Sequence, residues 1–193
     1  PGVEGLVAEL PAQQVAGRAG DERDGGGEGG SGGDGSRRTV TVTVLAADTA
    51  DPEAMAGLRA EVQAALPAGT PLTAVFHAAG VAQDSSPVAG MTLAEYADVV
   101  AAKTTGAELL AAAVADIPLE TFVLFSSNAG VWGGGGQAAY AAGNAHLDLL
   151  AHRLRAQRRP ALSVAWGAWA DGGMLARPEA AASLERRGLR AMP

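Results

Sequence analysis

Cysteine is absent from this sequence of 193 residues, and only 18% of the residues are charged. Without thiols the chain has no disulfide framework and no thiolate metal centre, and we expect no metal site. No apolar run reaches the length of a membrane span, and no charged-then-apolar leader opens the chain. We expect a cytoplasmic protein, because the lack of cysteine fits a reducing compartment.

The charge balance argues against two classes of partner. Lys and Arg together number 14 against 21 Asp and Glu, a formal net charge of −7. Negative charge disfavours binding to nucleic acid or to an anionic membrane surface, so we expect neither as a partner. The 193 residues are enough for one globular domain, and the 48% that are hydrophobic are enough to give it a core.

The N-terminal part changes composition abruptly. A short apolar pattern within residues 1–15 is typical of a surface helix, which Pro11 would end. From Gly25 to Gly35, eight of eleven residues are glycine. A phosphate-binding loop would need a preceding strand, a following helix and a defined glycine spacing, and none is present. We therefore predict a flexible insertion at about residues 20–37, because such a segment buries too little apolar surface to order itself.

Strand and helix patterns alternate along the rest of the chain. Leu162–Trp166 is a short apolar strand, and Thr92 with Glu95 forms a capping box that opens a helix reaching about Val114. The other predicted elements are strands at Thr39–Ala47, Leu72–His77 and Phe122–Phe125, and a helix at Asp51–Leu66.

The stretch from Thr121 to Ala145 carries the chemistry. A buried strand leads to two serines, then to a glycine-rich turn and a helical segment with Tyr140 and Asn144. Residues four apart on a helix share a face, and open α/β sheets bind ligands at the carboxyl ends of their strands, where Ser127 lies. Serine, tyrosine and asparagine side chains gathered there form a donor set for a carbonyl oxygen.

These motifs closely resemble the ketoreductase domain of modular polyketide synthases, within the short-chain dehydrogenase/reductase superfamily. Tyr140 stands 13 residues after Ser127, four before Asn144 and 37 after Lys103. Most of the superfamily carries YxxxK, whereas here Asn144 holds the place of that lysine and Lys103 comes from the preceding helix. The resemblance rests on HAAGV (77–81), VVAAKTTGAELL (99–110), FSSNAG (125–130), WGGGGQAAYAAGNA (132–145) and SVAWGAWADGGM (163–174).

The resemblance implies reduction of a β-keto thioester by hydride transfer from NADPH. Tyr140 would donate the proton and Ser127 would bind the carbonyl oxygen. Lys103 would supply the positive charge that a phenol of pKa about 10 needs to act near neutrality. Asn144 would orient Lys103 or a water. The partners implied are an acyl carrier protein bearing the β-ketoacyl thioester and other domains of the same synthase.

Further roles follow from the same resemblance. The implied cofactor-binding residues are Asp48, Ala78, Ala79, Gly80, Lys103, Tyr140, Gly167 and Ala168. Asp48 would contact the adenine, with a cap for the helix starting near Asp51 as the alternative. Lys103 would alternatively extend its ammonium to water. His77 is predicted to be a structural hydrogen-bonding residue rather than a catalytic base.

The implied residues of substrate binding and stereocontrol are Trp132, Gln137 and Met174. Trp132, eight residues before Tyr140, is the mark of A-type ketoreductases, and the Leu-Asp-Asp motif of the other type is absent. Trp132 would steer the substrate, or alternatively pack under the lid expected at about residues 172–193. With Gln137 three residues before Tyr140, the resemblance implies an L-hydroxyl product whose 2-methyl centre is not epimerised.

Two departures from the family pattern bear on the function. The glycine motif TGGxGxLG, which binds the cofactor pyrophosphate, does not occur in these residues. The resemblance implies an α/β fold, a Rossmann-like doubly wound parallel sheet with flanking helices, and against that fold the first two strands and the last are missing. We expect an incomplete ketoreductase domain whose activity in isolation is doubtful, and the alternative is a catalytically silent structural part of a synthase. An in-frame TGGxGxLG segment encoded upstream would favour the enzyme.

Overall fold

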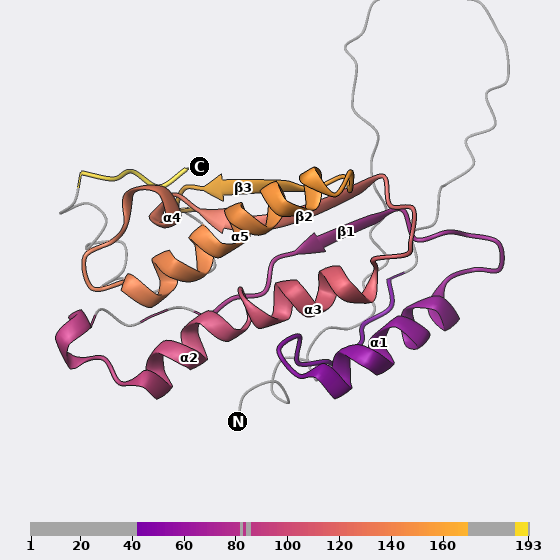
Figure 1. Cartoon of the computed structure of the whole chain (residues 1–193), viewed down its shortest axis with the longest axis horizontal. Coiled ribbons are helices and arrows are strands. Elements are labelled where there is room, and N and C mark those ends of the chain that lie inside the picture. Colours follow the sequence, from indigo (N-terminus) through magenta and orange to yellow (C-terminus); the bar gives the residue numbers. More distant parts are fainter. Residues whose placement is uncertain (1–41, 82, 84–85, 170–187, 193) are drawn as a thin grey trace, which may run out of the picture. The chain divides into compact units, whose positions relative to one another are not determined.

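The computed structural model describes residues 42–81, 83, 86–169 and 188–192 (Figure 1). The chain divides into two units, residues 1–46 and 47–193. Within the first unit only residues 42–46 are described. The expected helix in residues 1–15, the insertion at about 20–37 and most of the lid, with Met174, lie outside the described residues.

A parallel sheet forms the centre of the second unit. Its strands β1 (Ala74–His77), β2 (Thr121–Ser127) and β3 (Leu162–Trp166) are arranged in the order β1-β2-β3. In register, Val75 pairs with Phe122 and Phe125 pairs with Val164. The predicted α/β class with a parallel sheet is confirmed. Because parallel strands end at the same edge, the residues that follow all three strands meet there.

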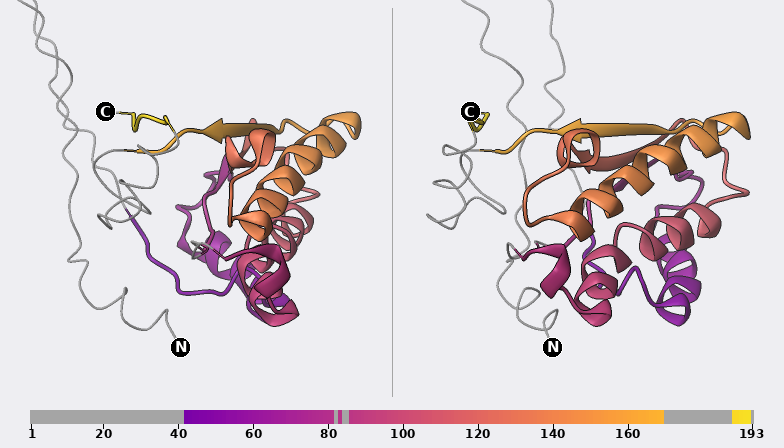
Figure 2. Two further views of the ribbon diagram at one scale, coloured as in Figure 1. Left: turned by 90° about the vertical axis from the view of Figure 1, so that its left-hand side faces the viewer. Right: turned by 60° about the vertical axis from the view of Figure 1, so that its left-hand side comes forward.

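The core lies between the sheet and two helices, α3 (Thr105–Ala113) and α5 (Ala138–Ala156). Helix α5 packs along β2 and β3 (Figure 2). Alanines of α3 and leucines of α5 belong to one buried cluster. The buried cluster consists of Ala107, Ala111, Val114, Phe122, Leu124, Leu147, Leu150, Ala151 and Leu154.

The opposite face of the sheet is partly open in the described part of the chain. Phe76 and Leu162 both pair with Val123, one on each side of it. Their exposed fractions are 62% and 53%, so no described helix covers them. None of the described helices has the length and apolar character that crossing a membrane requires.

Two helices begin at side-chain caps, and the sequence predicts the second of them. Helix α1 (Pro52–Ala65) follows Asp51, whose carboxylate accepts the backbone N–H of Glu53 at 2.8 Å. A short 3-10 helix, η1 (Val88–Gly90), precedes the next one. Helix α2 (Leu93–Ala101) begins with the capping box, because the side chains of Thr92 and Glu95 each bond the other's backbone N–H.

The prediction of one helix from Thr92 to about Val114 is wrong. The chain leaves the helix after Ala101 and re-enters it at Thr105. Two donors of Thr104, its backbone N–H at 2.8 Å and its hydroxyl at 3.0 Å, bond the carbonyl oxygen of Val100. A threonine hydroxyl that bonds back to the preceding turn favours a bend in the helix.

The prediction of a strand at Thr39–Ala47 is also wrong for the residues described. Residues 42–48 form no strand, and Val42 and Val44 are exposed. Alternating β-branched residues favour an extended backbone, but a strand also requires a neighbour that pairs its N–H and C=O groups. No described segment lies in register with these residues.

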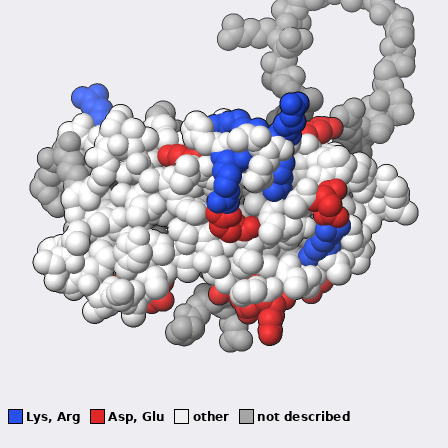
Figure 3. Space-filling model, viewed as in Figure 1, with Lys and Arg blue, Asp and Glu red and all other residues white. Residues whose placement is uncertain are grey.

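Ion pairs tie the helices together at the surface. Arg59 of α1 forms two hydrogen bonds to Asp116, at 2.6 and 2.8 Å, and Glu108 of α3 forms an ion pair with Arg153 of α5. Glu108 also lies within hydrogen-bond distance of Nε2 of His146, at 3.0 Å. Figure 3 shows basic and acidic side chains side by side on this face. Because the pair of Arg59 and Asp116 is open to solvent, its contribution to stability is small.

Two glycines give a matched test of helix packing. A Cβ on Gly130, in the short helix α4 (Ala129–Trp132), would lie 2.9 Å from the backbone nitrogen of Ala145. We expect Gly130→Ala to lower the free energy of unfolding by about 1–3 kcal/mol, because the backbone of α5 must move. Gly57, inside α1, has no atom within 4 Å of a built Cβ. Gly57→Ala is therefore expected to raise stability by about 0.5–1 kcal/mol. Urea denaturation measures both, and equal midpoints for the two variants would refute the packing described.

Candidate functional site

The candidate site lies at the edge where the strands end (Figure 1). Ser127 is the last residue of β2, Ala78–Gly80 follow β1, and Gly167 and Ala168 follow β3. Helix α5 brings Tyr140 and Asn144 from its first two turns, and the break between α2 and α3 brings Lys103.

Lys103 is the buried charged group of the site. The residue is 4% exposed, and its Nζ donates a hydrogen bond to the carbonyl oxygen of Phe125 at 2.9 Å. Burial lowers the pKa of Lys103 to about 8, because a charged ammonium loses hydration inside the protein. The same Nζ lies 6.0 Å from the centre of the Tyr140 ring. The alternative in which the ammonium extends to water is therefore wrong.

Two glycines leave the space that Lys103 fills. A Cβ on Gly80 would lie 2.8 Å from Cε of Lys103, and one on Gly143 would lie 3.3 Å from its Cβ. Gly80 belongs to the predicted site, but Gly143 does not. The sequence signal for Gly143 is a glycine inside a helix, which costs about 1 kcal/mol and therefore indicates a packing reason.

Asn144 is fully buried, with 0% exposure. Its side-chain nitrogen donates to the backbone carbonyl oxygen of Tyr140 at 2.7 Å. The backbone carbonyl oxygen of Asn144 accepts a hydrogen bond from the hydroxyl of Ser126 at 3.1 Å. The side-chain oxygen Oδ1 has no hydrogen-bond partner among the described residues. A buried acceptor is therefore free to orient a donor, and the predicted role of Asn144 toward Lys103 or a water stays a prediction.

Ser127 is half-buried at the end of β2. Its hydroxyl donates to Oδ1 of Asn128 at 3.3 Å and accepts the backbone N–H of Ala129 at 3.2 Å. These local bonds connect the strand to α4, a helix that the sequence analysis does not predict. The long donor distance marks a weak bond, which a stronger acceptor at the site can replace.

Tyr140 stands in the first turn of α5. Its backbone N–H donates to Oε1 of Gln83 at 3.0 Å, a contact that no motif in the sequence predicts. The predicted Gln137 is the residue that precedes α5, and its N–H donates to the carbonyl oxygen of Gly134 at 2.9 Å. Gln137 thus ends the glycine-rich turn and begins the helix that carries Tyr140.

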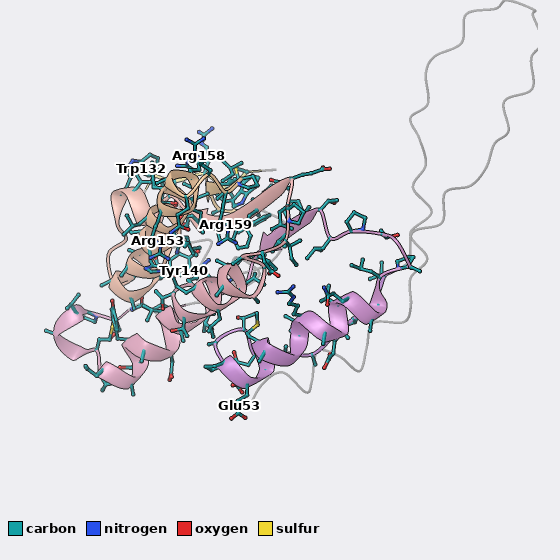
Figure 4. The ribbon with its side chains drawn as sticks, turned by 45° about the vertical axis from the view of Figure 1, so that its right-hand side comes forward. Glu53, Trp132, Tyr140, Arg153, Arg158 and Arg159 are labelled. Carbon is teal, nitrogen blue, oxygen red and sulfur yellow. The ribbon has the colours of Figure 1, made fainter. Side chains whose placement is uncertain are left out.

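Trp132 ends α4 with 74% of its surface exposed. Figure 4 labels Trp132 and Tyr140 on the neighbouring elements α4 and α5. The alternative of packing under the lid concerns residues outside the described part of the chain.

Asp48 and Ala168 of the predicted cofactor-binding set each accept a hydrogen bond from a backbone N–H. Asp48 is exposed, and its carboxylate accepts the N–H of Ala50 at 2.8 Å. The alternative role of Asp48 as a helix cap is wrong, because Asp51 caps α1. After β3, the carbonyl oxygen of Ala168 accepts the N–H of Met192 at 2.7 Å, and Gly167 faces the Met192 side chain.

His77 has the structural hydrogen bond predicted for it. The residue is 2% exposed, and its Nε2 lies 3.0 Å from the carbonyl oxygen of Ala102. Burial lowers the pKa of His77, and the charge of Lys103 lowers it further. A neutral imidazole in this position is a donor to the backbone rather than a proton acceptor for a substrate.

Comparison with known proteins identifies relatives for most of the chain. The family model described as "KR domain" matches residues 35–171. Pikromycin polyketide synthase component PikAIII of Streptomyces venezuelae is 51% identical over 151 residues, which cover 78% of this chain and 9% of that protein. Erythronolide synthase EryA3 of Saccharopolyspora erythraea is 49% identical over 153 residues, 78% of this chain and 4% of that protein.

Solved structures agree with these sequence relatives. A structure of A-type ketoreductases from a modular polyketide synthase matches with a TM-score of 0.74 and 51% identity, over 79% of this chain and 31% of that one. The first ketoreductase of the tylosin synthase matches with a TM-score of 0.64 and 49% identity, over 75% and 30%. The chain thus spans about a third of these structures and less than a tenth of the two synthase proteins.

The burial of Lys103 predicts a pH dependence of stability. The unfolded lysine has a pKa of about 10.4, and the folded one has a pKa of about 8. Between these values the unfolded chain binds more protons, so stability rises with pH over this range and is constant with respect to Lys103 below it. Relative to Lys103→Met, the native chain should gain up to about 3 kcal/mol from pH 8 to 10.4. Urea unfolding of both chains across this range measures the gain, and a constant difference would show that the ammonium is hydrated.

Proposed function

Because the chain belongs to the ketoreductase domain family of polyketide synthases, we propose that it forms part of an NADPH-dependent reductase. The substrate is a β-ketoacyl thioester on an acyl carrier protein, and the product is the β-hydroxyl thioester. One observation carries the proposal. The buried ammonium of Lys103 faces the ring of Tyr140 at the edge of the sheet where Ser127 ends β2.

The residues present fit one end of a nicotinamide cofactor. Ala78 and Gly80 are exposed after β1, and the absence of a side chain on Gly80 leaves Lys103 space beside it. An ammonium has three N–H donors, and Phe125 takes one of them, which leaves donors for ribose hydroxyls. Ala78–Gly80 and Lys103 would hold the ribose, while Gly167 and Ala168 would hold the nicotinamide amide. Asp48 would contact the adenine.

Bound NADPH would supply the hydride, and the side chains of this chain position the substrate carbonyl and stabilise the charge that develops on it. Tyr140 donates its phenolic proton to the oxygen of the substrate carbonyl as negative charge develops there. Lys103 favours this step, because its positive charge stabilises the phenolate that remains. Ser127 exchanges its weak bond to Asn128 for one to the same carbonyl oxygen. Asn144 uses its free Oδ1 to orient Lys103 or a water.

The acyl carrier protein and neighbouring synthase domains are the proposed partners. The relatives that match are polyketide synthases many times longer than this chain, which supports a reductase that works within a larger assembly. The exposed indole of Trp132, next to α5, is suited to direct a thioester arm entering the site. Gln137 and Met174 complete the proposed substrate-binding set.

The two tyrosines of the sequence allow a controlled test of the proton donor. Tyr140→Phe removes the phenolic proton and should lower kcat by about 10²–10⁴-fold, with little change in cofactor affinity. Tyr96→Phe is the matched control, because Tyr96 lies exposed on α2, and kcat should not change. The assay follows NADPH oxidation by the complete ketoreductase domain, expressed with the coding sequence that flanks these residues. Near-normal turnover by Tyr140→Phe would rule out Tyr140 as the acid.

The configuration of the product tests the roles of Trp132 and Gln137. We expect the reductase to convert a racemic 2-methyl-3-ketoacyl thioester to the L-hydroxyl product without epimerising the 2-methyl centre. An indole on one side of the site directs the thioester arm, so that hydride reaches one face of the carbonyl. Chiral chromatography of the product measures this outcome. A dominant D-hydroxyl product would be incompatible with the proposed entry side.

A further inference from the structure

The sheet holds the segment between α2 and α3 at two points. Nε2 of His77 bonds the carbonyl oxygen of Ala102 at 3.0 Å, and Phe125 accepts from Nζ of Lys103 at 2.9 Å. His77 ends β1 and Phe125 belongs to the adjacent strand β2, where the neighbouring residue Leu124 pairs with His77. The main chain just before Lys103 and the tip of its side chain are thus bonded to adjacent strands.

The Ala102 carbonyl depends on His77 for its hydrogen bond. In a continuous helix this oxygen would accept the backbone N–H four residues later, but the helix is broken at residues 102–104. Among the described residues, His77 is the donor that reaches it. Since a carbonyl oxygen only accepts, the proton of the neutral imidazole is on Nε2.

The other imidazole nitrogen shows that space filling is not the reason for a histidine here. Nδ1 of His77 is buried without a partner in the described part of the chain. A buried polar atom without a hydrogen bond is unfavourable. An apolar side chain of similar size would fill the same space without that cost. The donor to Ala102 therefore distinguishes histidine from leucine at this position.

Lys103 has little room to compensate for a shift of its backbone. A Cβ added to Gly80 or to Gly143 would already lie against its side chain, so both glycines border the space that the side chain fills. A displacement at Ala102 would move the stem of Lys103 into one of these glycines or release its ammonium from Phe125. The position of Nζ therefore depends on the position of the Ala102 carbonyl.

We propose that His77 is a positioning residue, which fixes Lys103 in the site by donating a hydrogen bond to the carbonyl oxygen of Ala102. The imidazole does so without adding a second positive charge, because burial and the Lys103 charge lower the pKa of His77. The consequence for turnover rests on the function proposed above, whereas the effect on Lys103 does not.

Lys103 is the single lysine of the sequence, so isotope-labelled lysine gives one side-chain NMR signal without assignment. In the native chain this signal should titrate with the pKa of about 8. His77→Leu removes the donor, and the pKa should rise toward the free value of about 10.4 as the ammonium reaches water. In His77→Gln the amide nitrogen can occupy the place of Nε2, and the titration should return close to that of the native chain. His152→Leu, at an exposed histidine of α5, is the control and should change nothing.

A second pair of variants and the kinetics of the complete domain test the same proposal. Should circular dichroism show that His77→Leu is unfolded, His77→Asn is compared with His77→Gln, because both carry an amide but only glutamine reaches Ala102. An unchanged Lys103 titration in folded His77→Leu, or in folded His77→Asn, would overturn the proposal. In the complete reductase domain, His77→Leu should lower kcat more than it raises KM. A shifted Lys103 signal combined with full activity of Tyr140→Phe would refute the proposed function and leave the positioning role supported.

Discussion

The hydrogen bond between the buried ammonium of Lys103 and the carbonyl oxygen of Phe125 is the interaction on which the site depends. Burying an ammonium is costly unless it gains partners, and here a strand carbonyl and a tyrosine ring supply them. The cost appears as the pKa lowered to about 8. Gly80, Gly143 and the break after Ala101 are the features of the fold that allow a lysine to reach this position.

Local patterns predict much of this fold because each has a local cause. The apolar run at Leu162–Trp166 predicts β3 with its observed bounds, and the Thr92–Glu95 capping box predicts the start of α2. One error has a cause that is not local, because residues 42–48 lack a described strand to pair with. The other has a local cause that the apolar pattern does not reveal: the hydroxyl of Thr104 bonds back to Val100 and interrupts a pattern that is otherwise helical.

In the candidate site, too, some residues can be predicted from the sequence and others cannot. Spacing together with the family resemblance brings Tyr140 and Asn144 onto one helix and indicates Lys103, and the structure places the Lys103 ammonium facing the Tyr140 ring. Gly143 and Gln83 could not be found this way, since each acts through a neighbour that is distant in sequence. Gln83 bonds a backbone N–H 57 residues away, a contact that depends on how the loop after β1 meets α5.

The two anchors of the Lys103 segment have a consequence for the order of folding. They join residues 25 and 22 positions apart, and one comes from β1 and the other from β2. Helices α2 and α3 can form from local contacts, but Lys103 is not held in place until both strands are present beside them. The reactive geometry is therefore a late product of assembly. An intermediate with its helices formed but its strands unpaired would contain every residue of the site and have none of its chemistry.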